Sequence, residues 1–318
     1  MGASPRGPFG PSAARAGAAD RRVPPIAGSD PVAPAPAGRV RTYGRFVRFE
    51  HTLFSLPMLF AGVFLGAGST APWRLLFLVL VAGTGARTAA LGLNRIIDRR
   101  IDAENPRTRT RELPSGALRL KDAWALTIAG AVAYGIAAWL IAPICLALAP
   151  IPLAVFAGYP YLKRVTPWCH LGVGLGLAMA PLGGWFAARL SFADPGPALL
   201  LAGFTLGWVA GFDVIYSTLD ESFDRSAGIR SLPARYGRET ALRISRGLHA
   251  AAWLCLATLV VWRLGWVPAL LPLVATGALL AWEQIRADDI DLAFFRINVW
   301  VGFAALVTIV AGLLGRGG

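Results

Sequence analysis

Two groups of side chains that offer oxygen ligands at the same spacing are the residues of this chain best suited to chemistry. The first group is Asn94, Asp98 and Asp102, which follow an apolar run and lie four residues apart. On a helix this spacing places the three side chains on nearly one face, about a turn apart. Aligned carboxylates repel one another strongly unless a cation neutralises them, so the spacing predicts a bound divalent metal.

The second group repeats this pattern much later in the chain. Asp220 and Asp224 are again four residues apart and again stand at the end of an apolar run. Both groups continue to an Arg-x-Leu-Pro element, at 111–114 and at 230–233. Each group alone is also compatible with a solvated helix end whose carboxylates pair with neighbouring arginines. Two copies at matching positions favour a functional pair.

Facing aspartates from two helices suit one kind of reaction. They can hold Mg²⁺, which prefers oxygen ligands and commonly completes its shell with waters and substrate phosphates. Basic groups on the same side, Lys163, Arg164 and arginines of the two loops, would hold phosphate oxygens. Metal and cations would neutralise a departing diphosphate, which favours ionisation of an allylic diphosphate. The apolar helices would hold its hydrocarbon tail.

The elements that must position these residues are membrane helices. Hydrophobic residues make up 55% of the 318 residues and charged residues 15%, with a mean hydropathy of +0.55. This composition is typical of a chain solvated by lipid. Nine apolar segments are each close to the roughly 20 residues that cross a bilayer. We expect them at about 52–70, 73–97, 122–141, 143–160, 168–188, 197–218, 247–264, 266–283 and 294–314.

The net charge of +13 lies mostly in short loops between the apolar segments. A nucleic-acid-binding protein would instead carry its basic residues on a folded soluble surface. Because basic loops stay in the cytoplasm, both aspartate motifs and the amino terminus are expected there. Nine spans then place the carboxyl terminus outside. We therefore expect an all-α plasma-membrane protein, one helical bundle whose central cavity opens towards the cytoplasmic side.

For the residues outside the motifs, the sequence predicts mainly structural roles. Residues 1–38 are rich in Pro, Ala, Gly and Arg and are expected to be a disordered extension of the polytopic domain 39–318. Residues 39–50 are basic and amphipathic, as in a helix at the lipid headgroups. The scattered cysteines and histidines predict packing rather than metal binding. The glycines within 172–177 and at 183–184 predict close helix packing.

The paired motifs and the nine spans resemble the UbiA superfamily of intramembrane aromatic prenyltransferases over about residues 40–314. The first motif reads N-x-x-x-D-x-x-x-D, and the second reads Y-x-x-x-D-x-x-x-D from Tyr216. Segments 50–57, 86–98, 105–116 and 162–170 look like the 4-hydroxybenzoate polyprenyltransferase branch. The second motif and the S-L-P-A-R-Y-G that follows it are similar to relatives in menaquinone synthesis by the futalosine route.

The resemblance implies Mg²⁺-dependent transfer of a polyprenyl group from polyprenyl diphosphate to an aromatic acceptor in respiratory quinone synthesis. The expected acceptor is 4-hydroxybenzoate, at the carbon ortho to its hydroxyl, and the alternative is 1,4-dihydroxy-6-naphthoate or a related ring. Carried over by position, the family's motifs imply one Mg²⁺ at Asn94, Asp98 and Asp102 and a second at Asp220 and Asp224. The resemblance also implies that the diphosphate is bound by Lys163, Arg164 and Arg107 or Arg111. The acceptor would lie near Tyr216 and Asp213.

Two residues deeper in the membrane have open roles. Arg87 lies two turns inward of Asn94 on the same face, where a charge is expected to have a partner and often a function. It would bind an acceptor carboxylate or the diphosphate, or else form a buried pair with Asp213. Asp213 is also a candidate for the base that removes the ring proton.

Two other classes of membrane protein also use intramembrane aspartates. A CDP-alcohol phosphotransferase needs Asp-Gly and Ala-Arg before a single aspartate cluster, whereas here Asn94 begins the motif and a second cluster follows. A transporter predicts charges near mid-bilayer and broken helices in symmetric halves. Here the acidic residues gather at one face, which favours the enzyme.

Overall fold

The computed structural model describes residues 39–46, 52–289 and 296–316, and the regular elements within these ranges are all helices. This confirms the predicted all-α class, while the predicted disorder of residues 1–38 lies outside the described residues. The helices are α1 (Arg39–Phe46), α2 (Thr52–Ala67), α3 (Trp73–Glu104), α4 (Leu120–Ile141), α5 (Pro143–Leu148), α6 (Pro150–Gly158), η2 (Tyr159–Arg164), α7 (Cys169–Arg189), α8 (Gly196–Ser217), η3 (Thr218–Asp220), α9 (Glu221–Ser226), α10 (Leu232–Tyr236), α11 (Arg238–Arg263), α12 (Trp266–Ile285) and α13 (Asn298–Leu314).

Seven helical stretches in the described residues are long and apolar enough to cross a membrane. One of them, residues 143–164, joins α5, α6 and η2 into a single stretch. The expected first and ninth segments correspond to α2 and α13, which are apolar but only 16 and 17 residues long. These two helices are shorter than the roughly 20 residues of a perpendicular crossing.

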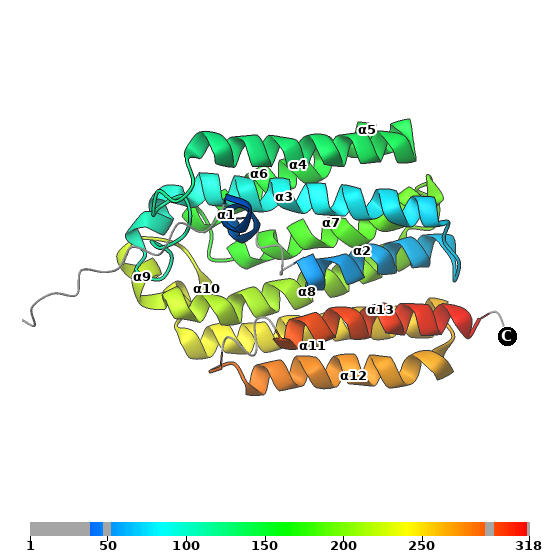
Figure 1. Cartoon of the computed structure of the whole chain (residues 1–318). Coiled ribbons are helices and arrows are strands. Elements are labelled where there is room, and N and C mark those ends of the chain that lie inside the picture. The colour runs from blue at the N-terminus through cyan, green and yellow to red at the C-terminus, as the bar shows by residue number, and fades with distance from the viewer. Residues whose placement is uncertain (1–38, 47–51, 290–295, 317–318) are drawn as a thin grey trace, which may run out of the picture. The chain divides into compact units, whose positions relative to one another are not determined.

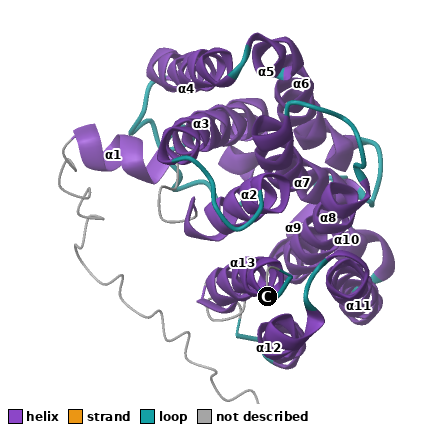
Figure 2. Ribbon diagram, turned by 90° about the vertical axis from the view of Figure 1, so that its right-hand side faces the viewer, coloured by secondary structure: helices purple, strands orange, loops and turns teal. Residues whose placement is uncertain are grey.

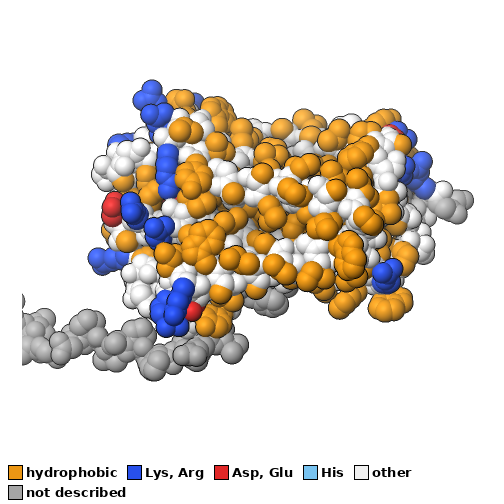
Figure 3. All heavy atoms as spheres, turned by 90° about the horizontal axis from the view of Figure 1, so that it is seen from above, with side chains coloured by type: hydrophobic (Ala, Val, Ile, Leu, Met, Phe, Trp, Pro, Cys, Tyr) orange, Lys and Arg blue, Asp and Glu red, His pale blue; other side chains and the backbone are white. Residues whose placement is uncertain are grey.

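The long helices run side by side in one bundle (Figures 1 and 2). Helix α8 is the most buried of the described spans and packs against α7 and α11, with Phe204 and Trp208 fully buried. Helix α2 packs against α7 and α13, and α3 against α4. On the face in Figure 3, hydrophobic side chains cover the middle and Lys and Arg gather at the ends. Such an apolar middle is what lipid tails would solvate.

Close helix approach depends on glycine where backbones meet. A Cβ atom added to Gly184 would lie 2.2 Å from the Leu59 carbonyl oxygen of α2, and one added to Gly174 would lie 2.4 Å from the Leu206 oxygen of α8. Both distances are far below van der Waals contact. The predicted packing role is therefore confirmed for Gly174 and Gly184, and it is wrong for Gly183, whose added Cβ would meet open space.

Helix α3 extends beyond the segment that hydropathy predicts. It continues to Glu104 instead of ending at residue 97, so Asn94, Asp98 and Asp102 all lie on one continuous helix. Helix α11 likewise begins at Arg238 rather than at residue 247. Hydropathy marks the part of a helix that lipid would surround, whereas backbone hydrogen bonding continues into the polar turns beyond it.

Candidate active site

The first motif lies at the end of α3, where its aspartates are buried and paired with basic side chains. Asp98 and Asp102 are almost fully buried. The Lys163 ammonium is 2.6 Å from Asp98 Oδ2, and an Arg164 guanidinium nitrogen is 3.4 Å from Asp98 Oδ1. Arg111 Nη1 lies 2.9 Å and 3.0 Å from the two oxygens of Asp102. Buried carboxylates need such partners, because an unpaired buried charge is strongly unfavourable.

The second motif passes from the end of α8 through η3 into α9. Asp220 accepts hydrogen bonds from Asn105 Nδ2 at 2.8 Å and from Arg107 Nε at 2.9 Å. The Ser231 hydroxyl donates to Asp224 Oδ2 at 2.8 Å. Asp224 also lies within electrostatic range of Lys163, the partner of the first motif. The two motifs therefore meet at one end of the bundle.

The loop after α3 joins the two motifs through Arg107. Its guanidinium binds Asp220, donates to the Tyr216 hydroxyl at 2.5 Å and stacks 4.7 Å from the centre of the Tyr216 ring. Burial disfavours the charged form of Arg107, but the hydrogen bonds and charge interactions with Asp220 and Tyr216 together outweigh burial and raise the pKa of Arg107 above its ordinary value. A buried ion pair between Arg95 of α3 and Glu112, 2.6 Å long, fastens the same loop.

The two Arg-x-Leu-Pro elements match in sequence but make different contacts in the structure. Arg111 of the first element binds the motif residue Asp102. Arg230 of the second donates instead to the Val165 carbonyl at 2.7 Å, and its amide donates to the Lys163 carbonyl at 2.8 Å. The first element therefore neutralises a carboxylate, whereas the second docks the loop after α9 onto the end of η2 and the residue that follows it.

A histidine that the sequence did not single out lies in this region. His170, at the start of α7, is buried, and its Nδ1 is 2.7 Å from Asp213 Oδ2. The Leu232 amide donates to the other ring nitrogen, Nε2, at 3.3 Å. The prediction that the histidines only pack is therefore incomplete, because His170 holds a candidate catalytic carboxylate.

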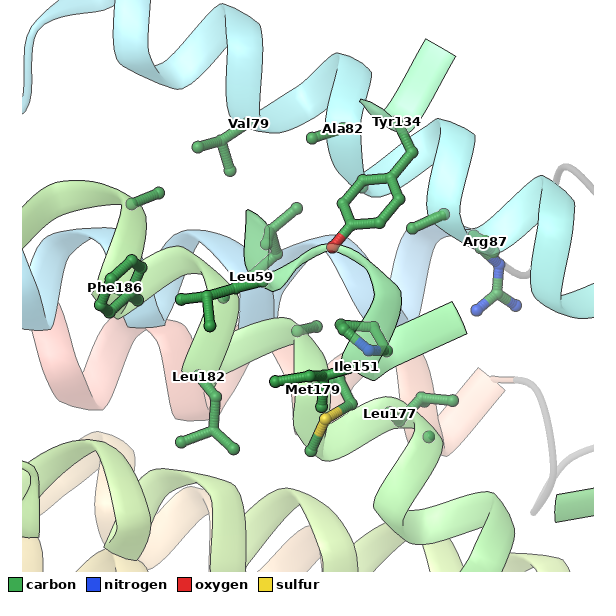
Figure 4. A pocket seen from close by; sticks show the side chains of 18 of the residues that line it. Leu59, Val79, Ala82, Arg87, Tyr134, Ile151, Leu177, Met179, Leu182 and Phe186 are labelled. Carbon is green, nitrogen blue, oxygen red and sulfur yellow. The ribbon is translucent and has the colours of Figure 1, made fainter. Parts of the chain in front are cut away.

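An apolar cavity of about 530 Å³ extends between α2, α3, α4 and α7. Arg87 and Tyr159 are among its lining residues, and Tyr159 is within electrostatic range of Asp98 and Asp213. Figure 4 shows Arg87 at one end of the cavity and the Tyr134 hydroxyl pointing into it, among apolar side chains such as Leu182 and Phe186. The space suits a hydrocarbon chain with a polar head near Arg87.

Comparison with known proteins agrees with this geometry. Residues 55–300 match the model of the UbiA prenyltransferase family. The chain belongs to this family. It is 31% identical over 299 residues to the 4-hydroxybenzoate octaprenyltransferase of Xanthomonas campestris pv. campestris (strain B100), covering 89% of this chain and 96% of that one.

Two solved structures share the fold. The apo structure of a UbiA homolog from Aeropyrum pernix K1 is 35% identical, with a TM-score of 0.74, and the match covers 84% of this chain and 98% of that one. A UbiA homolog from Archaeoglobus fulgidus, bound to DMAPP and Mg²⁺, has a TM-score of 0.62 at 18% identity and covers 85% of this chain and 99% of that one. The similarity to the Archaeoglobus fulgidus homolog shows a shared fold and nothing more.

The UbiA family implies a divalent metal, and the donors of this chain fit one. Carboxylate and amide oxygens from both motifs lie at one end of the bundle, and these are the ligands that Mg²⁺ prefers. In the described part of the chain, however, no three acidic, His or Cys side chains are grouped closely enough to hold a metal. Since Mg²⁺ usually binds through one or two carboxylates and substrate phosphates, this donor set suits a metal that arrives with a diphosphate.

The structure brings together most of the residues that the motifs predict. Asp98 meets Lys163 and Arg164, and Asp102 meets Arg111. Arg107 meets Asp220 and Tyr216. Arg87 lines the cavity, Asn94 lies next to Tyr159, and Asp213 lies against His170. Sequence reasoning missed Asn105 and His170, although both belong to the segments that resemble the family.

Proposed function

We propose that this UbiA-family chain transfers a polyprenyl group from polyprenyl diphosphate to 4-hydroxybenzoate, at the ring carbon ortho to the hydroxyl, in respiratory quinone biosynthesis. The observation that carries the proposal is that two carboxylate motifs and their basic partners meet at one end of the bundle, while Tyr159, within electrostatic range of Asp98, lines an apolar cavity. An amphiphilic substrate with a charged head and an isoprenoid tail matches that arrangement. The names of the relatives support the same reaction.

The two motifs would divide the binding of the diphosphate head. Asn94, Asp98 and Asp102 would hold one Mg²⁺, and Asp220 with Asp224 a second. When bound, these metals would stabilise the charge that develops on the leaving diphosphate. Lys163, Arg164, Arg107 and Arg111 already lie on these carboxylates and would turn towards the phosphate oxygens. Charge-assisted contacts of this kind orient the head and fix the reacting carbon beyond it.

The aromatic acceptor would lie between the motifs and the cavity. Tyr216 and Asp213 lie on α8 inward of Asp220, and Arg87 lines the polar end of the cavity. Arg87 would pair with the acceptor carboxylate or with the diphosphate. Asp213 would take the proton that the ring loses after the new carbon–carbon bond forms.

The membrane arrangement is part of the same proposal. Helices α2 and α13 complete nine spans, the motif end of the bundle faces the cytoplasm, and the protein resides in the plasma membrane. The amino terminus is then cytoplasmic and the carboxyl terminus outside. The basic residues of the loops after α3 and α9 support this orientation. Residues 1–38 are an extension that precedes the catalytic domain, 39–318.

The test is prenyl transfer by purified protein in detergent with Mg²⁺. One polyprenyl diphosphate is supplied with 4-hydroxybenzoate or with 1,4-dihydroxy-6-naphthoate, and Asp98→Asn serves as the control. We expect product from 4-hydroxybenzoate that disappears with a chelator and in the variant. Product from the naphthoate alone would assign the chain to menaquinone synthesis. No metal-dependent product from either acceptor would refute the proposal.

A further inference from the structure

We infer that His170 is a positioning residue that holds Asp213 as the acceptor of the ring proton. The inference rests on the proposed prenyl transfer and adds to it a residue that neither aspartate motif contains. It starts from the 2.7 Å contact between His170 Nδ1 and Asp213 Oδ2.

The hydrogen bonds of the His170 ring define its tautomer. The Leu232 amide donates to Nε2, so Nε2 must offer its lone pair. The ring proton then lies on Nδ1, and Nδ1–H donates to Asp213 Oδ2. A doubly protonated ring would point an N–H at the Leu232 N–H. The geometry therefore favours a neutral histidine that fixes one carboxylate oxygen and leaves the other available.

His170 is more deeply buried than Asp213, as expected for a residue that positions a carboxylate without contacting the substrate. The His170 side chain is 3% exposed, whereas the Asp213 side chain is 26% exposed. A buried imidazole cannot meet a substrate, but a partly open carboxylate can. Asp213 is also within electrostatic range of Tyr159, which lines the apolar cavity. Asp213 thus stands where an aromatic ring would lie between the diphosphate site and the cavity.

One short segment links this pair to the second motif. Ser231 donates to Asp224, and the next residue, Leu232, donates to His170. The segment is docked in turn, because the Arg230 amide donates to the Lys163 carbonyl at 2.8 Å. A position that binds the diphosphate and the position that binds the proton are thereby held by adjacent residues, through the Ser231 hydroxyl and the Leu232 amide. Such supporting contacts orient reactive groups and are costly to lose.

Prenyl transfer replaces a carbon–oxygen bond of the diphosphate and a carbon–hydrogen bond of the ring. The bond between the allylic carbon and the diphosphate oxygen breaks, and its electron pair leaves with the diphosphate. The ring carbon of the acceptor forms the new carbon–carbon bond. The C–H bond at that carbon then breaks, its electron pair restores the aromatic ring, and the proton passes to the free oxygen of Asp213. His170 keeps its own proton and acts only through the carboxylate that it holds.

The experiment compares His170→Leu, His170→Asn and Asp213→Asn in the full-length protein, with ordinary and ring-deuterated 4-hydroxybenzoate. If the naphthoate is the acceptor of the wild type, its ring-deuterated form is used. His249→Asn is the matched control, because His249 is also 3% exposed but bonds to Trp208 and Gln284. Acceptor-independent release of diphosphate is measured in parallel as the ionisation half-reaction.

We expect His170→Leu to lower kcat about 10- to 100-fold, the usual loss when an orienting partner is removed. A ring-deuterium isotope effect should appear with it, because proton removal becomes limiting. His170→Asn should restore much of the rate, since its amide N–H can replace Nδ1–H. Asp213→Asn should abolish transfer but keep diphosphate release, and it tests the pair even if His170→Leu fails to fold. His249→Asn should show no isotope effect.

The inference is overturned if His170→Leu turns over at the wild-type rate. It is also overturned if transfer and diphosphate release fall together without an isotope effect, because His170 would then be only a packing residue. Absence of aromatic product from the wild type itself is a separate result that refutes the proposed function.

Discussion

Lys163→Met is expected to destabilise the protein more than Asp98→Asn does, and the double variant is expected to recover stability relative to Lys163→Met. The reason is the unequal burial of the two partners. The Asp98 side chain is 3% exposed and the Lys163 side chain 26%. Losing Lys163 leaves a buried carboxylate, whereas losing the charge of Asp98 leaves an ammonium that water still reaches.

The magnitude follows from what remains around each group. Removing one partner of a fully buried pair costs about 3–5 kcal/mol. Arg164 stays 3.4 Å from Asp98, so for Lys163→Met we expect a smaller loss than that range, about 2–3 kcal/mol. Asn at position 98 still accepts a hydrogen bond from Lys163, which limits the cost of Asp98→Asn to about 1 kcal/mol. The double variant should therefore regain about 1 kcal/mol over Lys163→Met, which leaves it less stable than Asp98→Asn.

The assay is thermal unfolding in detergent, with a chelator present so that no metal replaces the missing ammonium. The order of midpoints from high to low should be wild type, Asp98→Asn, the double variant and Lys163→Met. Strictly additive losses in the double variant would refute the reasoning, because they would show that the two groups do not depend on each other. Equal losses in the two single variants would refute the argument from burial.

Two further predictions follow from contacts at other places. Arg107→Met removes charge-assisted hydrogen bonds to Asp220 and should raise the KM for polyprenyl diphosphate about 10- to 100-fold. Arg107→Lys should recover only part of the lost affinity. An unchanged KM in steady-state kinetics would contradict this prediction. Gly184→Ala places a methyl group against the Leu59 carbonyl and should cost about 1–3 kcal/mol. Gly183→Ala, with open space around its Cβ, should leave the thermal midpoint unchanged or raise it slightly, because Ala favours a helix more than Gly does.

The parts of the site that the sequence predicts are those set by local periodicity. The spacing of Asn94, Asp98 and Asp102 requires only that α3 be a helix, and α3 continues through all three. Hydropathy located the long spans because lipid exposure depends on composition. It placed the ends of α3 and α11 less well, since polar turns continue these helices outside the apolar run.

The pairings could not be predicted, because they join residues distant in sequence. Arg107 and Asp220 are 113 positions apart, and the partners of a buried charge depend on how helices are arranged in space. His170 was missed for a similar reason: its partner, Asp213, is 43 positions away. A buried histidine beside a carboxylate has no local pattern by which it differs from a packing histidine.

Among the described residues that line the cavity, Arg87 is the charged one, and it lies at one end. This asymmetry bears on the direction of the proposed reaction. Released diphosphate would escape into water beside the motifs, while the prenylated ring would follow its tail into lipid. Reversal would require both products to be recaptured at once from two different solvents. Separation of the products between two phases would then oppose the back reaction without any further residue acting as a gate.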